Sequence, residues 1–318
     1  MALDLRPLTL GELLDRAFTM YRRHFRLFVG LMALPSLFTL VFALTSELMQ
    51  ALARNKAESF AGATPEAIIG IFLGGSIAFI AIFIAYLVTY MVTLGATTVA
   101  VSEIYAGREA TIRSAYARVR GQIGRLMLLF LLIALRLMGI FVGVGFVMAI
   151  GGAALATAVG GAAGAVMSGI GLVVGVFGLM LGSFVFALRY SVSVPALMLE
   201  NVTARNAIRR SVSLTKGSLG RAAVLAIFAT ILAYAALFLL QGPFTIGVVM
   251  AGPETNAALA FSLMGAVAGT IGSAITGPIM IVALAVFYYD VRIRKEGLDL
   301  QLMVASLDHQ QITPAPAV

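Results

Sequence analysis

The sequence contains no cysteine and only two histidines among its 318 residues. The absence of cysteine excludes disulfide bonds, thiolate nucleophiles and metal sites built from thiolates. Charged side chains are also scarce: they make up 11% of the chain, against about 25% in ordinary soluble domains. So few charges exclude a soluble globular protein of this length, because they provide too little polar surface to keep it in solution.

Apolar residues dominate instead and occupy 61% of the positions. They come in long runs, and runs of about 18 or more are typical of membrane-spanning helices. We therefore predict an all-α fold, a polytopic membrane helix bundle with about six transmembrane helices. The second and fourth runs exceed one bilayer thickness, so they should tilt, kink near Gly95 and Pro195, or continue as surface helices. The predicted spans are Leu27–Met49, Glu66–Met91, Leu126–Ile150, Gly164–Tyr190, Ala222–Gln241 and Ala257–Tyr288.

The basic residues are distributed unevenly between the two sides of the predicted bundle. With the N-terminus inside, eighteen of the 22 Lys and Arg residues lie in inner segments, whereas only Arg54 and Lys56 lie in outer loops. Such an excess marks the cytoplasmic side of a membrane protein. The sequence thus predicts a multi-pass protein of the bacterial inner (plasma) membrane with both termini in the cytoplasm. We interpret the net charge of +8 as a result of basic residues that orient the protein in the membrane and contact lipid, and not as a sign of nucleic-acid binding.

An internal repeat is predicted from the inner segments that precede the odd-numbered spans. Each begins with a potential helix cap, Thr9, Thr111 or Thr203, and continues as an amphipathic stretch. Thr9 and Glu12 have the spacing of a capping box. The predicted module is a surface helix followed by two spans, repeated three times in a single membrane domain of residues 1–302. The repeats cover residues of about 8–105, 106–200 and 201–302, and a polar, disordered tail follows at 303–318.

The basic residues of these inner segments are the candidate binding residues of the chain. Two segments end in the same pattern, Gly121–Arg125 and Gly217–Arg221, in which glycine allows a turn and arginine anchors the corner at the level of the lipid phosphates. Anionic membrane lipid is therefore the expected partner, and a protein partner in the membrane is the alternative. The candidate lipid or partner contacts are Arg22, Arg23, Arg26, Arg113, Arg120, Arg125, Arg205, Arg209, Arg210, Lys216 and Arg221.

Three stretches resemble a known family. They are the opening Leu8–Asp15 with Tyr21–Phe25, the third inner segment Leu199–Gly217, and the exit motif Phe287–Asp299, which reads FYYDVRIRKEGLD. Together they are similar to the membrane domain found with glycerophosphoryl diester phosphodiesterases and to related bacterial multi-span membrane proteins. The resemblance extends over nearly the whole chain, to about Leu302. It implies a multi-span helical domain, sometimes fused to a phosphodiesterase, with no established activity of its own.

The catalytic residues of such a phosphodiesterase are missing from this chain. The enzyme part uses a His-Arg pair, acidic metal ligands and a second histidine, whereas His24 is followed by Phe25 and His309 lies in the polar tail. The pattern Ser213-Leu-Thr-Lys216 matches the Ser-x-x-Lys of acyl-enzyme formers but lacks the companion motifs. We therefore predict no enzyme activity, no catalytic residue, no cofactor and no metal site.

Arg136 is the most unusual residue within the predicted spans. It lies eleven residues beyond Arg125, about 16 Å into a hydrocarbon core of about 30 Å. A charge at that depth is expensive, so we expect Arg136 to form an interior polar site with Thr89, Tyr90, Tyr234 or a lipid phosphate. The alternative is that its side chain snorkels from a lipid-facing position.

Glycines also recur inside the spans. Gly164, Gly171, Gly175, Gly178 and Gly182 share one face of the fourth span, and Gly265, Gly269 and Gly272 repeat this pattern in the sixth. A helix face formed by small residues lets another helix pack closely, so we predict that these faces serve helix packing. The alternative is that the glycines line a path for a substrate.

Two classes of function follow from these features. The first is a non-catalytic membrane module that assembles with a partner or with anionic lipid at the cytoplasmic face. The second is a transporter or lipid carrier with an interior site around Arg136. Several buried ionisable groups and paired broken helices, which are typical of transporters, are not evident in the sequence, and this favours the first class.

Overall fold

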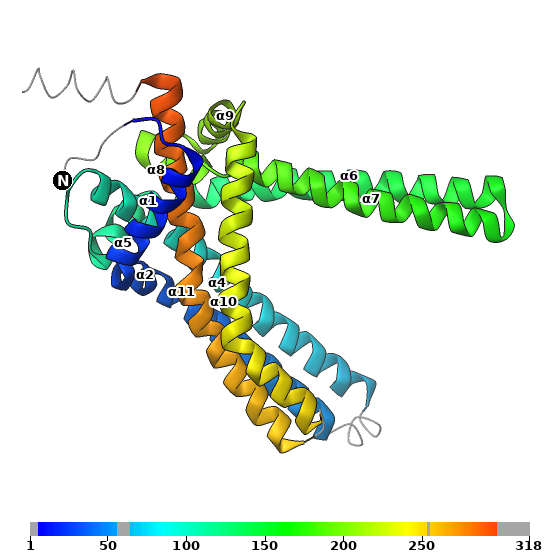
Figure 1. The fold of residues 1–318 in the computed structure, drawn as a ribbon. Coiled ribbons are helices and arrows are strands. Elements are labelled where there is room, and N and C mark those ends of the chain that lie inside the picture. The colour runs from blue at the N-terminus through cyan, green and yellow to red at the C-terminus, as the bar shows by residue number, and fades with distance from the viewer. Residues whose placement is uncertain (1–5, 56–63, 253–254, 298–318) are drawn as a thin grey trace, which may run out of the picture.

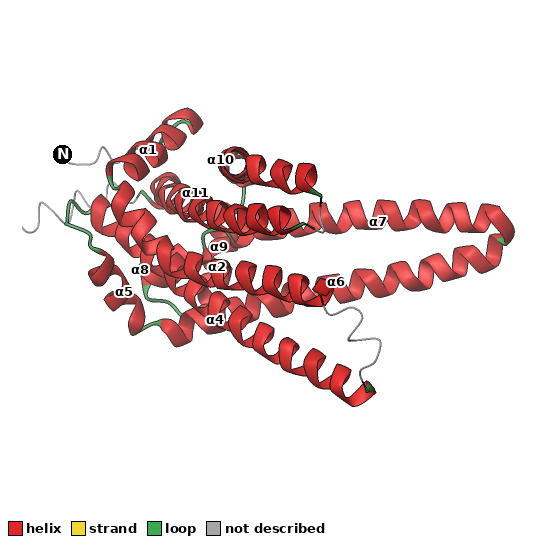
Figure 2. Cartoon of the chain, turned by 90° about the horizontal axis from the view of Figure 1, so that it is seen from below, coloured by secondary structure: helices red, strands yellow, loops and turns green. Residues whose placement is uncertain are grey.

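The protein is described here by a computed structural model, which describes residues 6–55, 64–252 and 255–297. Within these residues the regular structure is entirely helical (Figures 1 and 2). The predicted tail at 303–318 lies outside the described residues. The helices are α1 Leu10–Arg23, α2 Phe25–Asn55, α4 Pro65–Tyr105, α5 Ile112–Arg120, α6 Ile123–Val159, α7 Gly161–Tyr190, α8 Ser193–Glu200, α9 Ala204–Thr215, α10 Leu219–Ala251 and α11 Asn256–Glu296.

Six of these helices are long and apolar enough to cross a membrane, namely α2, α4, α6, α7 with α8, α10 and α11. The predicted fold class and the six spans are therefore confirmed. The helices are longer than a bilayer crossing requires: the 41 residues of α11 extend over about 60 Å, twice the thickness of the hydrocarbon core. The remaining length forms part of a helical layer at one end of the molecule.

The short helices alternate with the long ones in a regular order. A short helix precedes two long helices in α1–α2–α4, in α5–α6–α7 and in α9–α10–α11. Of the two predicted kinks, α4 runs without interruption through Gly95, whereas the chain breaks between α7 and α8. The break lies four residues before Pro195, whose ring would clash with the carbonyl of Ser191 in a regular helix, whereas Pro35, Pro243 and Pro278 lie inside continuous helices.

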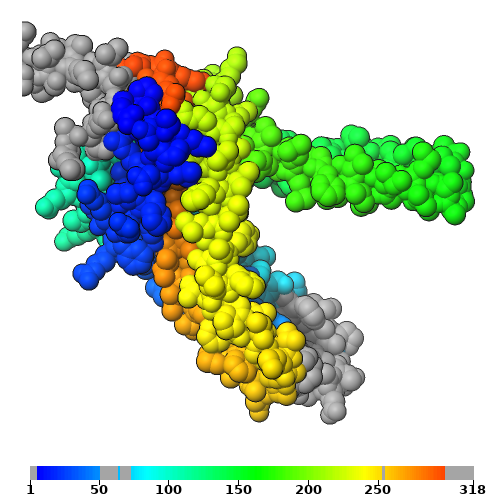
Figure 3. All heavy atoms as spheres, viewed as in Figure 1, coloured from blue at the N-terminus to red at the C-terminus, as the bar shows by residue number. Residues whose placement is uncertain are grey.

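The molecule has a packed end and two arms (Figure 1). We call the packed end the region in which α1, α5, α8 and α9 surround the adjoining ends of α4 and α11. From it, the α6–α7 arm extends in one direction and a four-helix arm of α2, α4, α10 and α11 in another; Figure 3 shows the α6–α7 arm as a separate rod. The fully buried apolar side chains, such as Leu13, Val119, Leu197 and Phe287, lie in the packed end.

All three predicted helix caps are present. The hydroxyl of Thr9 accepts from the backbone N–H of Glu12 at 3.3 Å, and the Glu12 carboxylate accepts from the N–H of Thr9 at 2.7 Å. Hydrogen bonds from the Thr9 backbone and from Arg6 lower the pKa of Glu12 to about 2. Thr111 forms the same arrangement with Ser114, and Thr203 accepts from the N–H of Asn206. Side-chain caps satisfy amides that the first helical turn leaves without partners.

The apolar faces of the short helices pack in part against protein. On α1 the buried residues are Leu13, Ala17, Met20 and Tyr21, whereas Phe18 is exposed. On α5 the buried residues are Ala115 and Val119. Amphipathic periodicity is the same whether a helix lies on lipid or on protein, so the sequence could not distinguish these environments.

Tyrosine hydroxyls of two short helices donate to backbone carbonyls of long helices. Pro35 has no N–H, so the carbonyl of Leu31 in α2 lacks its helical donor. The hydroxyl of Tyr116 in α5 donates to this carbonyl at 2.7 Å, and burial raises the pKa of Tyr116. Tyr21 in α1 likewise donates to a carbonyl of a long helix, that of Ile275 in α11, although this carbonyl is not the one that Pro278 leaves without a helical donor.

The glycine faces of the two spans have different surroundings. A Cβ at Gly265, Gly269 or Gly272 of α11 would lie within 3.3 Å of side chains of α10. Packing, as predicted, therefore accounts for this face. On α7, Gly164 and Gly175 contact α6, whereas a Cβ at Gly171, Gly178 or Gly182 would meet no described atom within 4 Å.

Candidate functional site

The exit motif on α11 forms the centre of the packed end. The carboxylate of Asp290 is fully buried and accepts hydrogen bonds from the backbone N–H of Leu8 at 2.9 Å and from Arg294 at 3.2 Å. Arg221 at the start of α10 lies 3.0 Å from the same carboxylate and donates to the carbonyl of Leu8 at 2.8 Å. A buried charge needs such partners, and together they hold the N-terminal segment against α11.

A second ion-pair cluster joins α8, α9 and α11. Arg210 lies 2.8 Å from Glu200 and 2.5 Å from Glu296, while Arg292 lies 3.0 Å from Glu296. The hydroxyl of Tyr288 donates to Glu200 at 2.7 Å. Two arginines and two glutamates thus neutralise one another, so this cluster serves to position the three helices.

Other residues of the exit motif also make long-range contacts. The ring of Tyr289 stacks on that of Tyr105 at the end of α4, with ring centroids 4.5 Å apart. Lys295 donates to the carbonyl of Ser213 at 2.8 Å and to that of Lys216 at 2.5 Å, where α9 ends. The most specific part of the sequence resemblance is therefore the part that assembles the packed end.

These contacts change the interpretation of two candidate binding residues. Arg210 and Arg221 face internal carboxylates and are engaged in ion pairs, so they are structural residues of the packed end. The sequence could not show this, because Asp290 lies 69 residues beyond Arg221. The other nine candidates are exposed and form no ion pair with a described residue; they are Arg22, Arg23, Arg26, Arg113, Arg120, Arg125, Arg205, Arg209 and Lys216.

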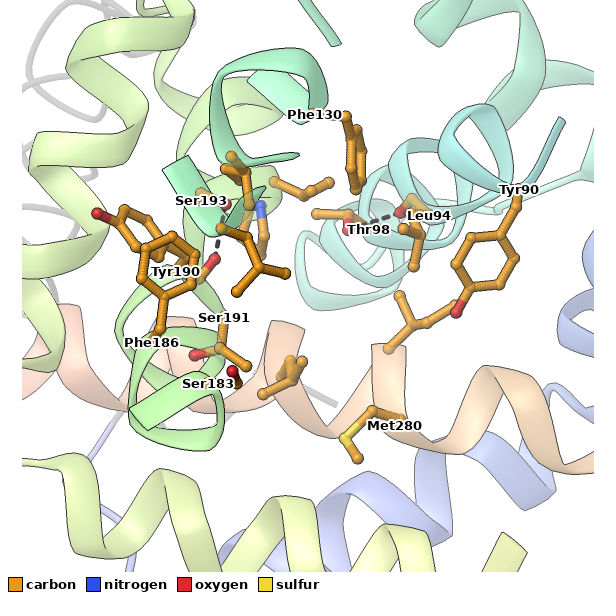
Figure 4. Close-up of a pocket in the computed structure, with 17 residues that line it drawn as sticks. Tyr90, Leu94, Thr98, Phe130, Ser183, Phe186, Tyr190, Ser191, Ser193 and Met280 are labelled. Atoms are coloured by element: carbon orange, nitrogen blue, oxygen red, sulfur yellow. Dashed lines mark hydrogen bonds between the residues drawn. The ribbon is translucent and has the colours of Figure 1, made fainter. Parts of the chain in front are cut away.

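A cavity of about 310 Å³ lies where the two arms separate (Figure 4). It is bounded by α4 and α11 of the four-helix arm, by α6 and α7, and by the first turn of α8. Its volume is at the lower end of the range of small-molecule sites. The cavity exists because the chain breaks at residues 191–192 and α8 turns away from α7.

The cavity wall is mainly apolar. Leu94, Phe130, Ile133, Leu137 and Leu284 contribute hydrocarbon surface, and no charged side chain lines it among the described residues. Several hydroxyls are turned toward helix carbonyls: that of Thr98 donates to Leu94 and that of Ser193 to Tyr190, as Figure 4 shows. The Oγ of Ser183 is buried and has no hydrogen-bond partner in the described part of the chain.

Arg136 lies beside this cavity, on the exposed flank of α6. Its guanidinium is 5.9 Å from the centroid of the Tyr190 ring, which itself lines the cavity. The structure places Arg136 at an exposed position on the cavity border, and both the interior polar site and the lipid-facing alternative stay predictions. Tyr190 was not among the expected partners, because its proximity depends on how α6 and α7 pair. The cavity itself was not predicted from the sequence. Pro195, which lies inside an apolar run, was the one sequence signal of the break between α7 and α8 beside which the cavity lies.

Metal ligands do not cluster in the part of the chain that the structure describes: there, no three His, Asp or Glu side chains come together in a way that could hold a metal ion. The carboxylates of the packed end instead face arginines. Glu103, for example, pairs with Arg108 at 2.7 Å and also with Arg118.

The helices and their hydropathy define a polytopic α-helical membrane protein. Residues 164–312 match the family described as the membrane domain of glycerophosphoryl diester phosphodiesterase. The match includes the third inner segment and the exit motif, and it confirms the predicted resemblance to this family over the C-terminal part of the chain. No curated protein and no solved structure matches the chain.

Proposed function

We propose that the protein is an integral membrane module without catalytic activity of its own, which binds anionic lipid through the basic surface of its packed end. The observation that supports this proposal is the set of nine exposed arginine and lysine side chains on α1, α5, α9 and the adjoining helix ends. Their helices bury many of their apolar side chains against protein, whereas Phe18 of α1 and Ile112 of α5 are exposed. The charged faces are the larger surfaces that remain available for binding.

Pairing inside the chain leaves this surface positive. Glu103, Glu200, Asp290 and Glu296 are each bound to arginines, so they do not neutralise the exposed basic residues. Each Lys or Arg near an anionic leaflet contributes about 1 kcal/mol, and salt screens the attraction over about 10 Å. Several such residues together favour an anionic membrane surface over a neutral one.

The proposal places the packed end and both termini in the cytoplasm, with the chain in a bacterial inner membrane. The excess of basic residues in the inner segments supports this orientation. Because the chain has no cysteine, single cysteines introduced at Ser213 and at Asn256 report the two sides directly. A membrane-impermeant thiol reagent should label Asn256→Cys in intact cells and Ser213→Cys only after lysis; labelling of Ser213→Cys in intact cells would contradict the orientation.

Thermal unfolding of the full chain in detergent with added lipid tests the lipid proposal. Phosphatidylglycerol should raise the midpoint more than phosphatidylcholine does, and the difference should shrink as salt is added. The triple variant Arg22→Gln, Arg113→Gln and Arg205→Gln should reduce the stabilisation, by up to about 3 kcal/mol for three charges.

The matched control replaces the same three residues by lysine, which keeps the charge and should keep most of the effect. Equal stabilisation by the two lipids, or a glutamine variant that responds as the wild type does, would show that the basic surface does not select anionic lipid. Of the two proposed binding modes of the module, only binding of a protein partner at this surface would then remain.

A further inference from the structure

The cavity between the two arms has a location that is specific to a membrane protein. Its walls come from long helices of both arms, and α8 lies at the side of the packed end. In Figure 1 the α6–α7 arm separates from the other long helices at this point. Because the cavity lies between helices that are long and apolar enough to cross a membrane, lipid is the molecule that we expect beside it.

The chemistry of the wall fits a hydrocarbon chain. The wall is mostly aliphatic and aromatic, and the hydroxyls of Thr98, Ser191 and Ser193 are occupied by helix carbonyls. A charged group inside the cavity would have no described counter-charge on the wall. At about 310 Å³, the cavity has room for part of one acyl chain but not for a whole two-chain lipid.

A cationic group lies at the border of this apolar cavity. Arg136 follows the wall residue Ile133 by three positions and precedes Leu137 directly, and its guanidinium lies over the ring of Tyr190. A guanidinium within the depth of the membrane is costly without an anionic partner. Its planar array of donors matches the oxygens of a phosphate, which makes phosphate a suitable partner.

We infer that the cavity holds an acyl chain of one membrane phospholipid whose phosphate binds Arg136. The apolar wall contacts the acyl chain. The adjacent Arg136 binds the phosphate, which is the one anionic group that every phospholipid has. This site is lined by α4, α6, α7, α8 and α11, and it includes none of the nine exposed basic residues of the packed end. It therefore goes beyond the proposed binding of the leaflet surface and does not depend on it.

The test measures lipid binding to the purified, delipidated full chain in detergent by native mass spectrometry. The probes are dioleoyl-phosphatidylglycerol, dioleoylglycerol, which lacks the phosphate, and inorganic phosphate. The wild type should bind one phosphatidylglycerol in preference to further lipids, and dioleoylglycerol more weakly. Inorganic phosphate should not displace the lipid; displacement would show a site for free phosphate instead.

Substitutions distinguish binding of the acyl chain in the cavity from binding of the lipid phosphate at Arg136. Ser183→Phe fills the cavity and should abolish the preferential binding, whereas Ser168→Phe, on the same helix and outside the cavity, should leave it intact. Arg136→Leu should weaken phosphatidylglycerol binding about tenfold or more, as expected when a hydrogen bond to a charged group is lost, and leave dioleoylglycerol binding unchanged. Arg136→Lys should lie between wild type and Arg136→Leu, because it keeps the charge without the planar donors.

Arg113→Leu on α5 distinguishes this site from the basic surface. It should not alter the single preferential lipid, and an equal loss with Arg113→Leu and Arg136→Leu would place that lipid at the packed end and overturn the inference. Equal binding by wild type, Ser183→Phe and Arg136→Leu would overturn it as well. If Ser183→Phe does not fold, as judged by its thermal midpoint, Ser183→Leu takes its place.

Discussion

At the packed end, polar side chains bond across elements that are far apart in the sequence, whereas along the α6–α7 arm they bond to their own helix. Arg221 reaches Leu8, and Tyr288 reaches Glu200. In the arm, the hydroxyl of Thr157 donates to Ala153 and that of Ser168 to Ala165, both within one turn. The tertiary arrangement is thus specified by polar contacts at the packed end, whereas the polar contacts of the arm are local to each helix.

The largest effect that follows from this comparison concerns Asp290. Asp290→Asn removes the charge that Arg221 and Arg294 share, and breaking a buried pair costs about 3–5 kcal/mol. We expect a large fall in the thermal midpoint of the purified protein in detergent. Asp15→Asn, at an exposed position of α1, is the control and should have little effect; equal midpoints for the two variants would mean that the packed end does not depend on this carboxylate.

A smaller effect is expected where a short helix bonds to the carbonyl that a proline leaves without its helical donor. Tyr116→Phe leaves the carbonyl of Leu31 without its tyrosine donor and should cost about 1–3 kcal/mol. In a Pro35→Ala background the backbone can supply the missing N–H, so the same substitution should cost much less, which a double-mutant cycle of thermal midpoints measures. Tyr234→Phe, at a side chain on α10 that is 70% exposed, is the control. An undiminished cost in the Pro35→Ala background would show that the proline is not the reason for the tyrosine contact.

The smallest expected effect tests the packing within the α6–α7 arm. A Cβ at Gly164 would lie 2.8 Å from the carbonyl oxygen of Ala156, so Gly164→Ala must move the backbone and should destabilise by about 1 kcal/mol. Gly178 has open space, and Gly178→Ala should be neutral or should stabilise by up to about 1 kcal/mol through helix propensity. Thermal unfolding measures both. A cost at Gly178 as large as at Gly164 would indicate that another surface covers this face of α7.

Local sequence patterns predicted the helices and their caps well. Apolar runs, the threonines at positions 9, 111 and 203, and the proline at 195 act over a few residues, so their consequences can be derived without knowing the fold. The exit motif was also identified from sequence as the most specific part of the family resemblance. Its role could not be derived, since Tyr288, Asp290 and Lys295 find partners in segments that are 79 to 282 residues away.

The sequence by itself thus determined that the chain is a six-span helical membrane protein, because hydrophobic length and charge are additive properties of short segments. Only the tertiary structure decided which arginines are internal, where the cavity lies, and that Arg136 stands at its border beside Tyr190. These features depend on the direction in which each helix leaves the packed end. That direction follows from long-range ion pairs and hydrogen bonds between helices, and no periodicity within a single segment encodes it.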